Sequence, residues 1–259
     1  MHDRTPAVFS RRLRALVDWL GALALAGGLL AACSSSPPPA PTSPMGIVQD
    51  RPVPTTVLMN DDGRPTSLAT YRGKDIVVAP FLSLCQDECP LVTGAFIALQ
   101  RDVAAAGLSG KVVFMEVSVD PWRDSPARLR AYSTQFGAHW PLLTGSEPTV
   151  RAFWKFFGVY FAKVPEQQPA KTDWWTGKPL TFDVDHTDGF ILIDATGHER
   201  FITVQPPNLH GKLSPGLKAL LNAGGLQNLD SQTPSSWTIP EALADVGWLV
   251  GRTITPATS

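Results

Sequence analysis

The stretch DIVVAPFLSLCQDECPLVTGAF, residues 75–96, joins an apolar run to two cysteines and the start of a helix. Residues 75–84 are apolar and rich in β-formers, which predicts a strand that is buried on both faces. Pro90 suits the first turn of a helix, because that turn needs no backbone N–H from it. We therefore expect a helix from Pro90 to about Ala106, with both cysteines in the loop that leads into it.

The rest of the chain repeats this alternation. Apolar runs predict further strands at 111–120, 189–194 and 199–204, and capping residues and helical periodicity predict helices at 125–137, 147–158 and 212–225. Strands that alternate with helices predict an α/β fold, a central sheet with helices on both faces.

Two regions fall outside that pattern. One is the polar and aromatic insertion at 163–182, in which Trp174 and Trp175 form either a partner-docking surface or a flap on the core. The other is the tail, residues 226–259, for which the sequence assigns no role. Its segment 239–254 has the composition of an amphipathic helix that packs on the domain or touches a membrane.

The first residues resemble an export signal. A basic segment precedes the apolar run at 20–32, which is too short to cross a membrane and suits the core of a signal peptide. Its end, LAAC at 30–33, resembles the lipobox of bacterial lipoproteins. We therefore predict a signal peptide at 1–32, lipidation of Cys33, and a Ser/Pro-rich tether at 33–52.

The amino-acid composition limits the classes of partner that the protein is expected to bind. The formal net charge is −1, and removal of residues 1–32 leaves 18 basic and 21 acidic residues, a net charge of −3. Such a chain gives no reason to expect nucleic-acid binding. The predicted location, lipid-anchored on the extracytoplasmic face of the cell membrane, permits disulfides.

The pair Cys85 and Cys89 allows three interpretations. It could be a structural disulfide, although so short a loop would gain little from one. It could be a redox dithiol, because a helix amino terminus favours thiolate. It could also supply two ligands of a metal site. A structural zinc site usually needs four Cys or His ligands, whereas two thiolates with one imidazole suit copper.

One histidine stands out as a third ligand. His186 is predicted to lie on the loop just before the strand at 189–194, and sites in open α/β sheets gather where loops meet strand ends. His139, His198 and His210 are expected to have surface or structural roles.

Four segments together resemble the Sco/SenC family, thioredoxin-like copper chaperones for cytochrome c oxidase assembly. They are SLATYRGKDIVVAPF, CQDECP, VSVDPWRDSPARLRAYSTQFG and DVDHTDGFILID, within residues 53–222. The resemblance implies a thioredoxin-like fold for the domain, taken as 53–225, and copper held by Cys85, Cys89 and His186. Asp87 and Asp120 fall where outer-shell residues could lie.

The resemblance favours a binding protein over an enzyme. It implies a membrane-tethered copper chaperone that loads an apo-cuproprotein, such as the CuA site of oxidase subunit II, by ligand exchange. A thiol–disulfide oxidoreductase that uses Cys85 and Cys89 is the alternative, and a peroxide-reducing or redox-sensing variant is a third. The C-x-x-x-C spacing, and a histidine where thioredoxin-like reductases place a cis-proline, favour copper.

Overall fold

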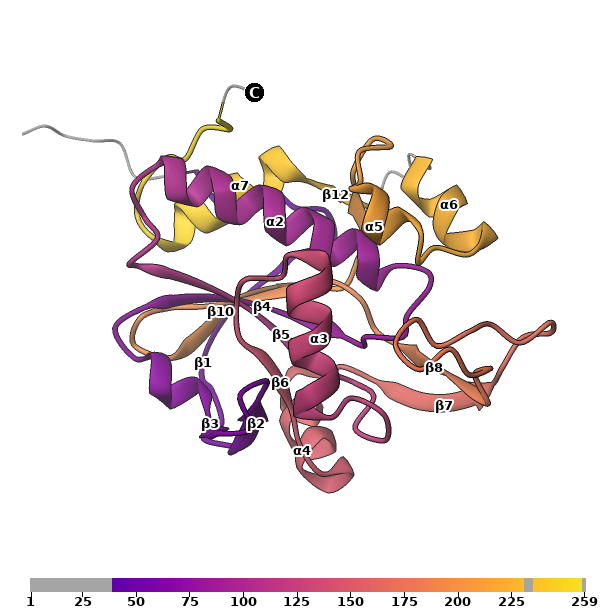
Figure 1. Cartoon of the computed structure of the whole chain (residues 1–259). Coiled ribbons are helices and arrows are strands. Elements are labelled where there is room, and N and C mark those ends of the chain that lie inside the picture. The colour runs from indigo at the N-terminus through magenta and orange to yellow at the C-terminus, as the bar shows by residue number, and fades with distance from the viewer. Residues whose placement is uncertain (1–38, 231–234, 258–259) are drawn as a thin grey trace, which may run out of the picture. The chain divides into compact units, whose positions relative to one another are not determined.

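The fold is organised around a mixed eight-stranded sheet in the order β1-β10-β9-β4-β5-β6-β2-β3 (Figure 1). The computed structural model describes residues 39–230 and 235–257. The strands of the sheet are β1 (Ile47–Pro52), β2 (Leu58–Asn60), β3 (Pro65–Thr66), β4 (Asp75–Phe81), β5 (Val112–Ser118), β6 (Leu142–Thr144), β9 (Phe190–Ile193) and β10 (His198–Thr203). Strands β4, β5 and β6 pair in parallel, and the remaining pairs are antiparallel.

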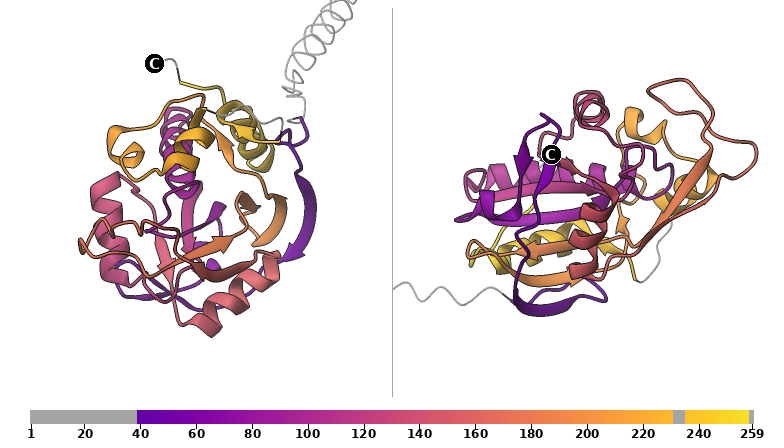
Figure 2. Two further views of the ribbon diagram at one scale, coloured as in Figure 1. Left: turned by 90° about the vertical axis from the view of Figure 1, so that its right-hand side faces the viewer. Right: turned by 90° about the horizontal axis from the view of Figure 1, so that it is seen from below.

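The helices cover this sheet on both sides. They are η1 (Leu68–Tyr71), α2 (Cys89–Ala105), α3 (Pro126–Phe136), α4 (Glu147–Phe157), α5 (Pro215–Lys218), α6 (Ala223–Asp230) and α7 (Ile239–Leu249). Helices α2 and α7 pack side by side above the sheet in Figure 1, and α4 lies below it. The views of Figure 2 show the same layers from the side and from below. The predicted α/β class with a mixed central sheet is confirmed.

The predicted capping chemistry explains where the helices begin and end. The Ser125 hydroxyl accepts a hydrogen bond from the Arg128 N–H at the start of α3, and Gly137 ends that helix in the left-handed region.

Strand β4 is buried throughout its apolar part, with Val77 and Val78 at most 1% exposed. Its neighbours β5 and β9 are also buried almost throughout.

Three features of the structure differ from the predicted elements or were not predicted. Residues 47–52, which the sequence assigned to the tether, form β1 and pair with β10. The helix expected at 212–225 is two short helices, α5 and α6, because the Asn222 side chain accepts the Gly225 N–H and starts a new helix there. The insertion is framed by a two-stranded hairpin, β7 (Phe161–Pro165) and β8 (Phe182–His186).

The tail also packs on the domain. A short parallel pair, β11 (Pro207–Asn208) and β12 (Trp237–Thr238), leads into α7, which contacts α2 and β9. Buried Asp245 of α7 accepts hydrogen bonds from the backbone N–H groups of Thr42 and Ser43. Helix α7 therefore holds the segment that leads into β1.

The predicted signal peptide at 1–32 and the lipidation site Cys33 lie outside the described residues. Both stay predictions. Within 39–230 and 235–257, none of the helices has the length and apolar character needed to cross a bilayer.

Candidate metal centre

The two cysteines lie where β4 leaves the sheet and α2 begins. After Phe81 the chain turns, and the Cys85 N–H donates to the Leu82 carbonyl. Helix α2 starts at Cys89 with Pro90 in its first turn, as the sequence predicts. The Cys89 N–H then points back at the Cys85 Sγ, 3.3 Å away. The helix amino terminus thus supplies a hydrogen-bond donor that stabilises negative charge on Cys85.

A histidine from the hairpin completes the group. The Cys85 Sγ, the Cys89 Sγ and a ring nitrogen of His186 all lie within 4.8 Å of one another. The His186 Nε2 is 3.4 Å from the Cys89 Sγ. Two metal–ligand bonds of about 2.0–2.3 Å span up to about 4.5 Å, so small shifts would let the three atoms share one ion. Among the residues that the structure describes, no other cluster of three such side chains has this geometry.

The two thiols differ in environment. Cys89 is 1% exposed, and burial raises its pKa well above the ordinary value. Cys85 is half-buried, and the hydrogen bond from the Cys89 thiol lowers its pKa to about 6, against the effect of burial and with help from His186. Cys85 is therefore the thiol of the pair that ionises first, and Cys89 is the one that keeps its proton longer.

His186 is held with one ring nitrogen directed at the two sulfurs. It is the last residue of β8, not a loop residue as the sequence suggested, and its side chain is 7% exposed. The Nδ1 lies 3.0 Å from the Thr187 carbonyl and donates to it, which leaves Nε2 facing the sulfurs. Burial alone would lower the pKa of His186, but Cys85 and Asp188 raise it to about 9.

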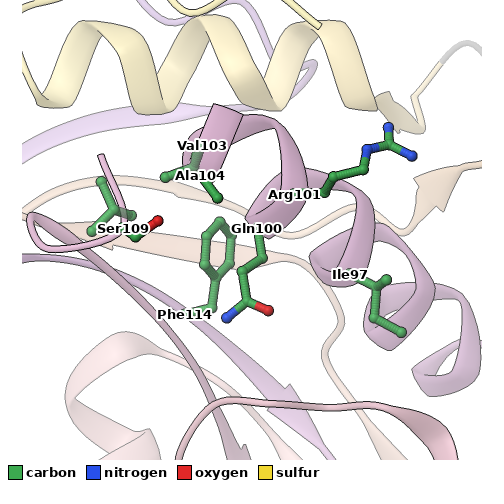
Figure 3. Close-up of a pocket in the computed structure, with 8 residues that line it drawn as sticks. Ile97, Gln100, Arg101, Val103, Ala104, Ser109 and Phe114 are labelled. Carbon is green, nitrogen blue, oxygen red and sulfur yellow. The ribbon is translucent and has the colours of Figure 1, made fainter. Parts of the chain in front are cut away.

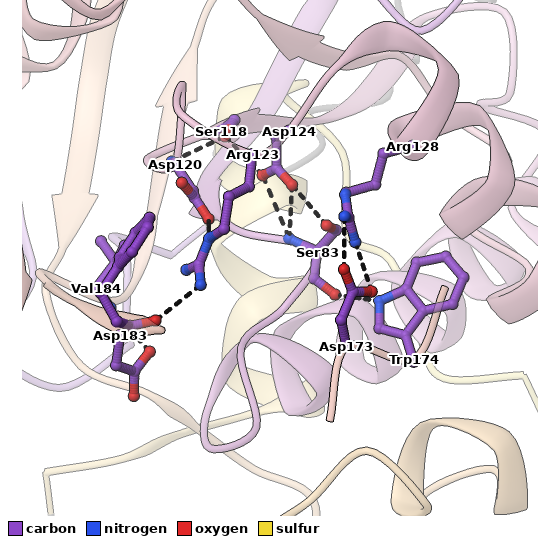
Figure 4. Close-up of polar contacts among 11 residues, drawn as sticks. Ser83, Ser118, Asp120, Arg123, Asp124, Arg128, Asp173, Trp174, Asp183 and Val184 are labelled. Carbon is purple, nitrogen blue, oxygen red and sulfur yellow. Dashed lines mark hydrogen bonds and ion pairs between the residues drawn. The ribbon is translucent and has the colours of Figure 1, made fainter. Parts of the chain in front are cut away.

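Arg123 fixes the hairpin that carries His186. Its Nη1 donates to the Phe182 carbonyl at the start of β8 over 2.7 Å, and its guanidinium lies 4.0 Å from the centre of the Phe182 ring. The Asp120 carboxylate accepts from the Arg123 Nε at 2.5 Å and is fully buried (Figure 4). Asp120, predicted as a possible outer-shell residue, thus contacts Arg123, the residue that holds β8; its outer-shell role stays a prediction.

Asp124 fixes the other half of the site. Its buried carboxylate accepts hydrogen bonds from the Ser83 N–H, the Ser83 hydroxyl and the Ser118 hydroxyl (Figure 4). The segment that enters the cysteine loop is therefore tied to the end of β5. Sequence reasoning did not single out Arg123 or Asp124, although both stand in the segment VSVDPWRDSPARLRAYSTQFG on which the family resemblance rests.

The tryptophan pair of the insertion is divided between core and surface. The Trp174 ring packs against Tyr132 and Phe136, and its Nε1 donates to the Ser83 carbonyl at 2.7 Å. Trp175 is 46% exposed. Of the two predicted roles, Trp174 has that of a flap on the core, and it braces the same segment as Asp124.

A pocket of about 380 Å³ opens beside Cys85 and His186. Its carboxylates are Asp87, Glu88, Asp183, Asp185 and Asp188. Burial, together with Asp188 and Asp87, raises the pKa of Glu88 to about 10. Burial also raises the pKa of Asp87, while a hydrogen bond from Asn228 opposes this rise. The open side of the metal centre is therefore acidic.

The other histidines in the part of the chain that the structure describes lie elsewhere. His139 and His210 are exposed, and the His198 Nδ1 is 2.7 Å from Asp50. A separate groove of about 310 Å³ lies along the far part of α2, between Ile97 and Phe114 (Figure 3). No cysteine, histidine or carboxylate lines this groove, so it offers no metal chemistry.

Comparison with known proteins places the chain in a family. The SCO1/SenC family model matches residues 52–212. Protein sco1 of Schizosaccharomyces pombe is 28% identical over 151 residues, which cover 57% of this chain and 52% of that protein. The match thus spans about half the length of that relative.

The chain is also similar to solved structures. Apo Sco1 of Thermus thermophilus is 23% identical with a TM-score of 0.50, and the match covers 73% of this chain and 98% of that one. Copper-bound ScoI of Bradyrhizobium japonicum is 23% identical with a TM-score of 0.48, over 67% and 94%. The likeness to the Thermus protein confirms the predicted thioredoxin-like fold. Because the family model covers more than half of its residues, the chain belongs to the SCO1/SenC family.

Proposed function

We propose that this protein is a copper-binding metallochaperone whose ligands are Cys85, Cys89 and His186. The observation that carries the proposal is the convergence of two sulfurs and one imidazole nitrogen within 4.8 Å. Soft thiolates favour Cu(I), and the imidazole helps to accept Cu(II). Membership in the SCO1/SenC family supports copper as the cargo.

Transfer is proposed to proceed by ligand exchange. Three protein ligands leave a coordination position open toward the acidic pocket, where an incoming thiolate can bind. Cys89 is the buried ligand and holds the ion from the inside, whereas Cys85 and His186 line the pocket, so the incoming thiolate first replaces one of these two. The three ligands need not move together, so the ion is never released into water.

The location and the recipient are further parts of the proposal. The Sco family is associated with cytochrome c oxidase assembly, and we infer that the recipient is an apo-cuproprotein such as the CuA-bearing subunit II. We infer also that lipid on Cys33 tethers the domain to the outer face of the cell membrane. The sequence of the LAAC segment supports that anchor.

Metal titration of the reduced protein tests the proposal. About one copper per chain is expected, and the Cu(II) form should show a sulfur-to-copper charge-transfer band. His186→Ala should weaken Cu(II) binding much more than Cu(I) binding, because the two thiolates remain. His139→Ala, at an exposed histidine, is the matched control. Equal loss of both oxidation states in His186→Ala would contradict the assigned role of the imidazole.

The asymmetry of the two thiols favours a second candidate, a thiol–disulfide oxidoreductase. Cys85, with its lowered pKa, would attack a partner disulfide to form a mixed disulfide. Cys89 would resolve it, which releases the partner as a dithiol and leaves a Cys85–Cys89 disulfide. Cys89→Ser should then trap the mixed disulfide, and Cys85→Ser should not. Copper delivery that leaves both cysteines reduced would favour the chaperone instead.

A further inference from the structure

The segment 222–228, which lies beyond the part of the chain that the family model matches, contacts the loop between the two cysteines. The Asn222 N–H donates to the Gln86 carbonyl over 2.7 Å. Asn222 also begins α6, because its side chain accepts the Gly225 N–H. The start of α6 is thus joined directly to the cysteine loop.

Gly225 allows α6 to approach the loop closely. It is buried, and a Cβ atom at this position would lie 2.7 Å from the Gln86 carbonyl oxygen and 3.0 Å from the Asp87 Cα. Both contacts are with backbone, which cannot swing away as a flexible side chain can. A residue larger than glycine would therefore push the cysteine loop out of its present position.

Asn228 lies one turn further along α6 and reaches the acidic side chains of the loop. Its Nδ2 donates to the Asp87 Oδ1 at 2.7 Å and to the Glu88 Oε1 at 3.3 Å. A single neutral amide thus holds two adjacent acidic side chains in one arrangement. With the contacts of Asn222 and Gly225, each residue between Cys85 and Cys89 is contacted by this segment.

Helix α6 is itself anchored to the domain without help from the loop. Leu229 is fully buried, and its carbonyl accepts the N–H of Gly211. The helix can therefore act as a fixed support and does not simply follow the loop. The loop has only three residues between two ligands, so its conformation decides where both sulfurs point.

We propose that α6 is a clamp on the metal centre, and that Asn228 and Gly225 are its positioning residues. The proposal rests on the proposed copper function, because the quantity that the clamp tunes is the affinity of the Cys85, Cys89 and His186 group for copper. The proposal gives a role to the part of the chain beyond the matched family region. That part holds the cysteine loop in the conformation that binds the ion. Neither residue touches the ion.

Substitutions on α6 test the clamp. Asn228→Ala removes both side-chain hydrogen bonds, and Asn228→Asp places a third carboxyl group beside Asp87 and Glu88. Outer-shell changes typically weaken metal binding about 10–100-fold, so we expect about a tenfold rise in the Cu(II) Kd for Asn228→Ala and a larger rise for Asn228→Asp. Gln227→Ala, an exposed neighbour on the same helix, is the control and should bind as the unsubstituted protein does.

A second readout needs no copper. In Asn228→Ala the loop is no longer held by α6 and should expose Cys85 more. The rate at which iodoacetamide alkylates Cys85 should therefore rise several-fold. The melting temperature of Asn228→Ala should stay close to that of Gln227→Ala. Failure of the unsubstituted protein to bind copper would overturn the proposed function, and the alkylation rates would still decide whether the loop is clamped. Unchanged alkylation and unchanged Cu(II) affinity in both Asn228 variants would overturn the clamp.

Discussion

Replacement of Arg123 by methionine is the sharpest test of how the site is held together. Methionine keeps most of the length of the side chain but removes its charge and its donors. The change breaks the ion pair with Asp120 and the bond to the Phe182 carbonyl. It leaves a fully buried carboxylate without its cation, and one oxygen of that carboxylate already has no hydrogen-bond partner.

The size of the effect follows from this burial. Removal of one partner from a buried ion pair typically costs about 3–5 kcal/mol, because the remaining charge is uncompensated. The lost bond to the Phe182 carbonyl adds about 1 kcal/mol. Burial already raises the pKa of Asp120 against the pull of Arg123, so in Arg123→Met the carboxyl should bind a proton on folding. The loss of stability should therefore be largest at high pH and shrink as the pH falls.

Urea unfolding followed by circular dichroism measures this loss. The double variant Asp120→Asn/Arg123→Met has no stranded charge, so it should be more stable than Arg123→Met alone by about 2 kcal/mol. Copper titration of the single variant should show weaker Cu(II) binding, because the strand that carries His186 has lost its anchor. A loss below about 1 kcal/mol, or a double variant no more stable than Arg123→Met, would refute the reasoning.

Three other substitutions test separate parts of the structure. Burial raises the pKa of Glu116 to about 8, so the native state keeps a proton that the unfolded chain has lost. Stability should therefore fall between about pH 4.5 and 8, by up to about 1.4 kcal/mol per unit, and Glu116→Gln should flatten this slope in urea unfolding. Gly189→Ala should lower the melting temperature far more than Gly63→Ala. Both glycines have positive φ, but a Cβ at Gly189 would clash with the Thr203 carbonyl oxygen of β10, and one at Gly63 would meet nothing within 4 Å. Asp245→Ala should speed hydrogen exchange of the backbone amides at 42–43, which lose their acceptor; unchanged exchange would contradict the contact.

The central elements could be predicted because their signals are local. The buried run that became β4 and the proline that starts α2 lie within the elements that they define, and the serine and glycine that bound α3 lie directly beside it. Strand β1 was missed because it follows a Ser/Pro-rich stretch and gains its stability from pairing with β10, far away in the sequence. The break between α5 and α6 was missed because the apolar pattern runs on through 217–221.

The candidate site, like the fold, was predicted only in part. Cys85, Cys89 and His186 could be proposed from residue type and motif, and the fold brings all three together. The residues that hold these three side chains in place could not be predicted, because each acts through contacts between distant parts of the chain. Nothing in the sequence around Asn228 indicates that its amide reaches Asp87, 141 residues away.

The acidic pocket beside Cys85 has a kinetic consequence. Even with Glu88 protonated, Asp183, Asp185 and Asp188 give the opening a negative potential, and such fields change encounter rates by about 10–1,000-fold at low ionic strength. Added salt should therefore slow copper uptake from a positively charged donor and hasten its removal by a negatively charged chelator. The carboxylates at the opening would therefore select exchange partners by their charge before any copper–sulfur bond forms or breaks.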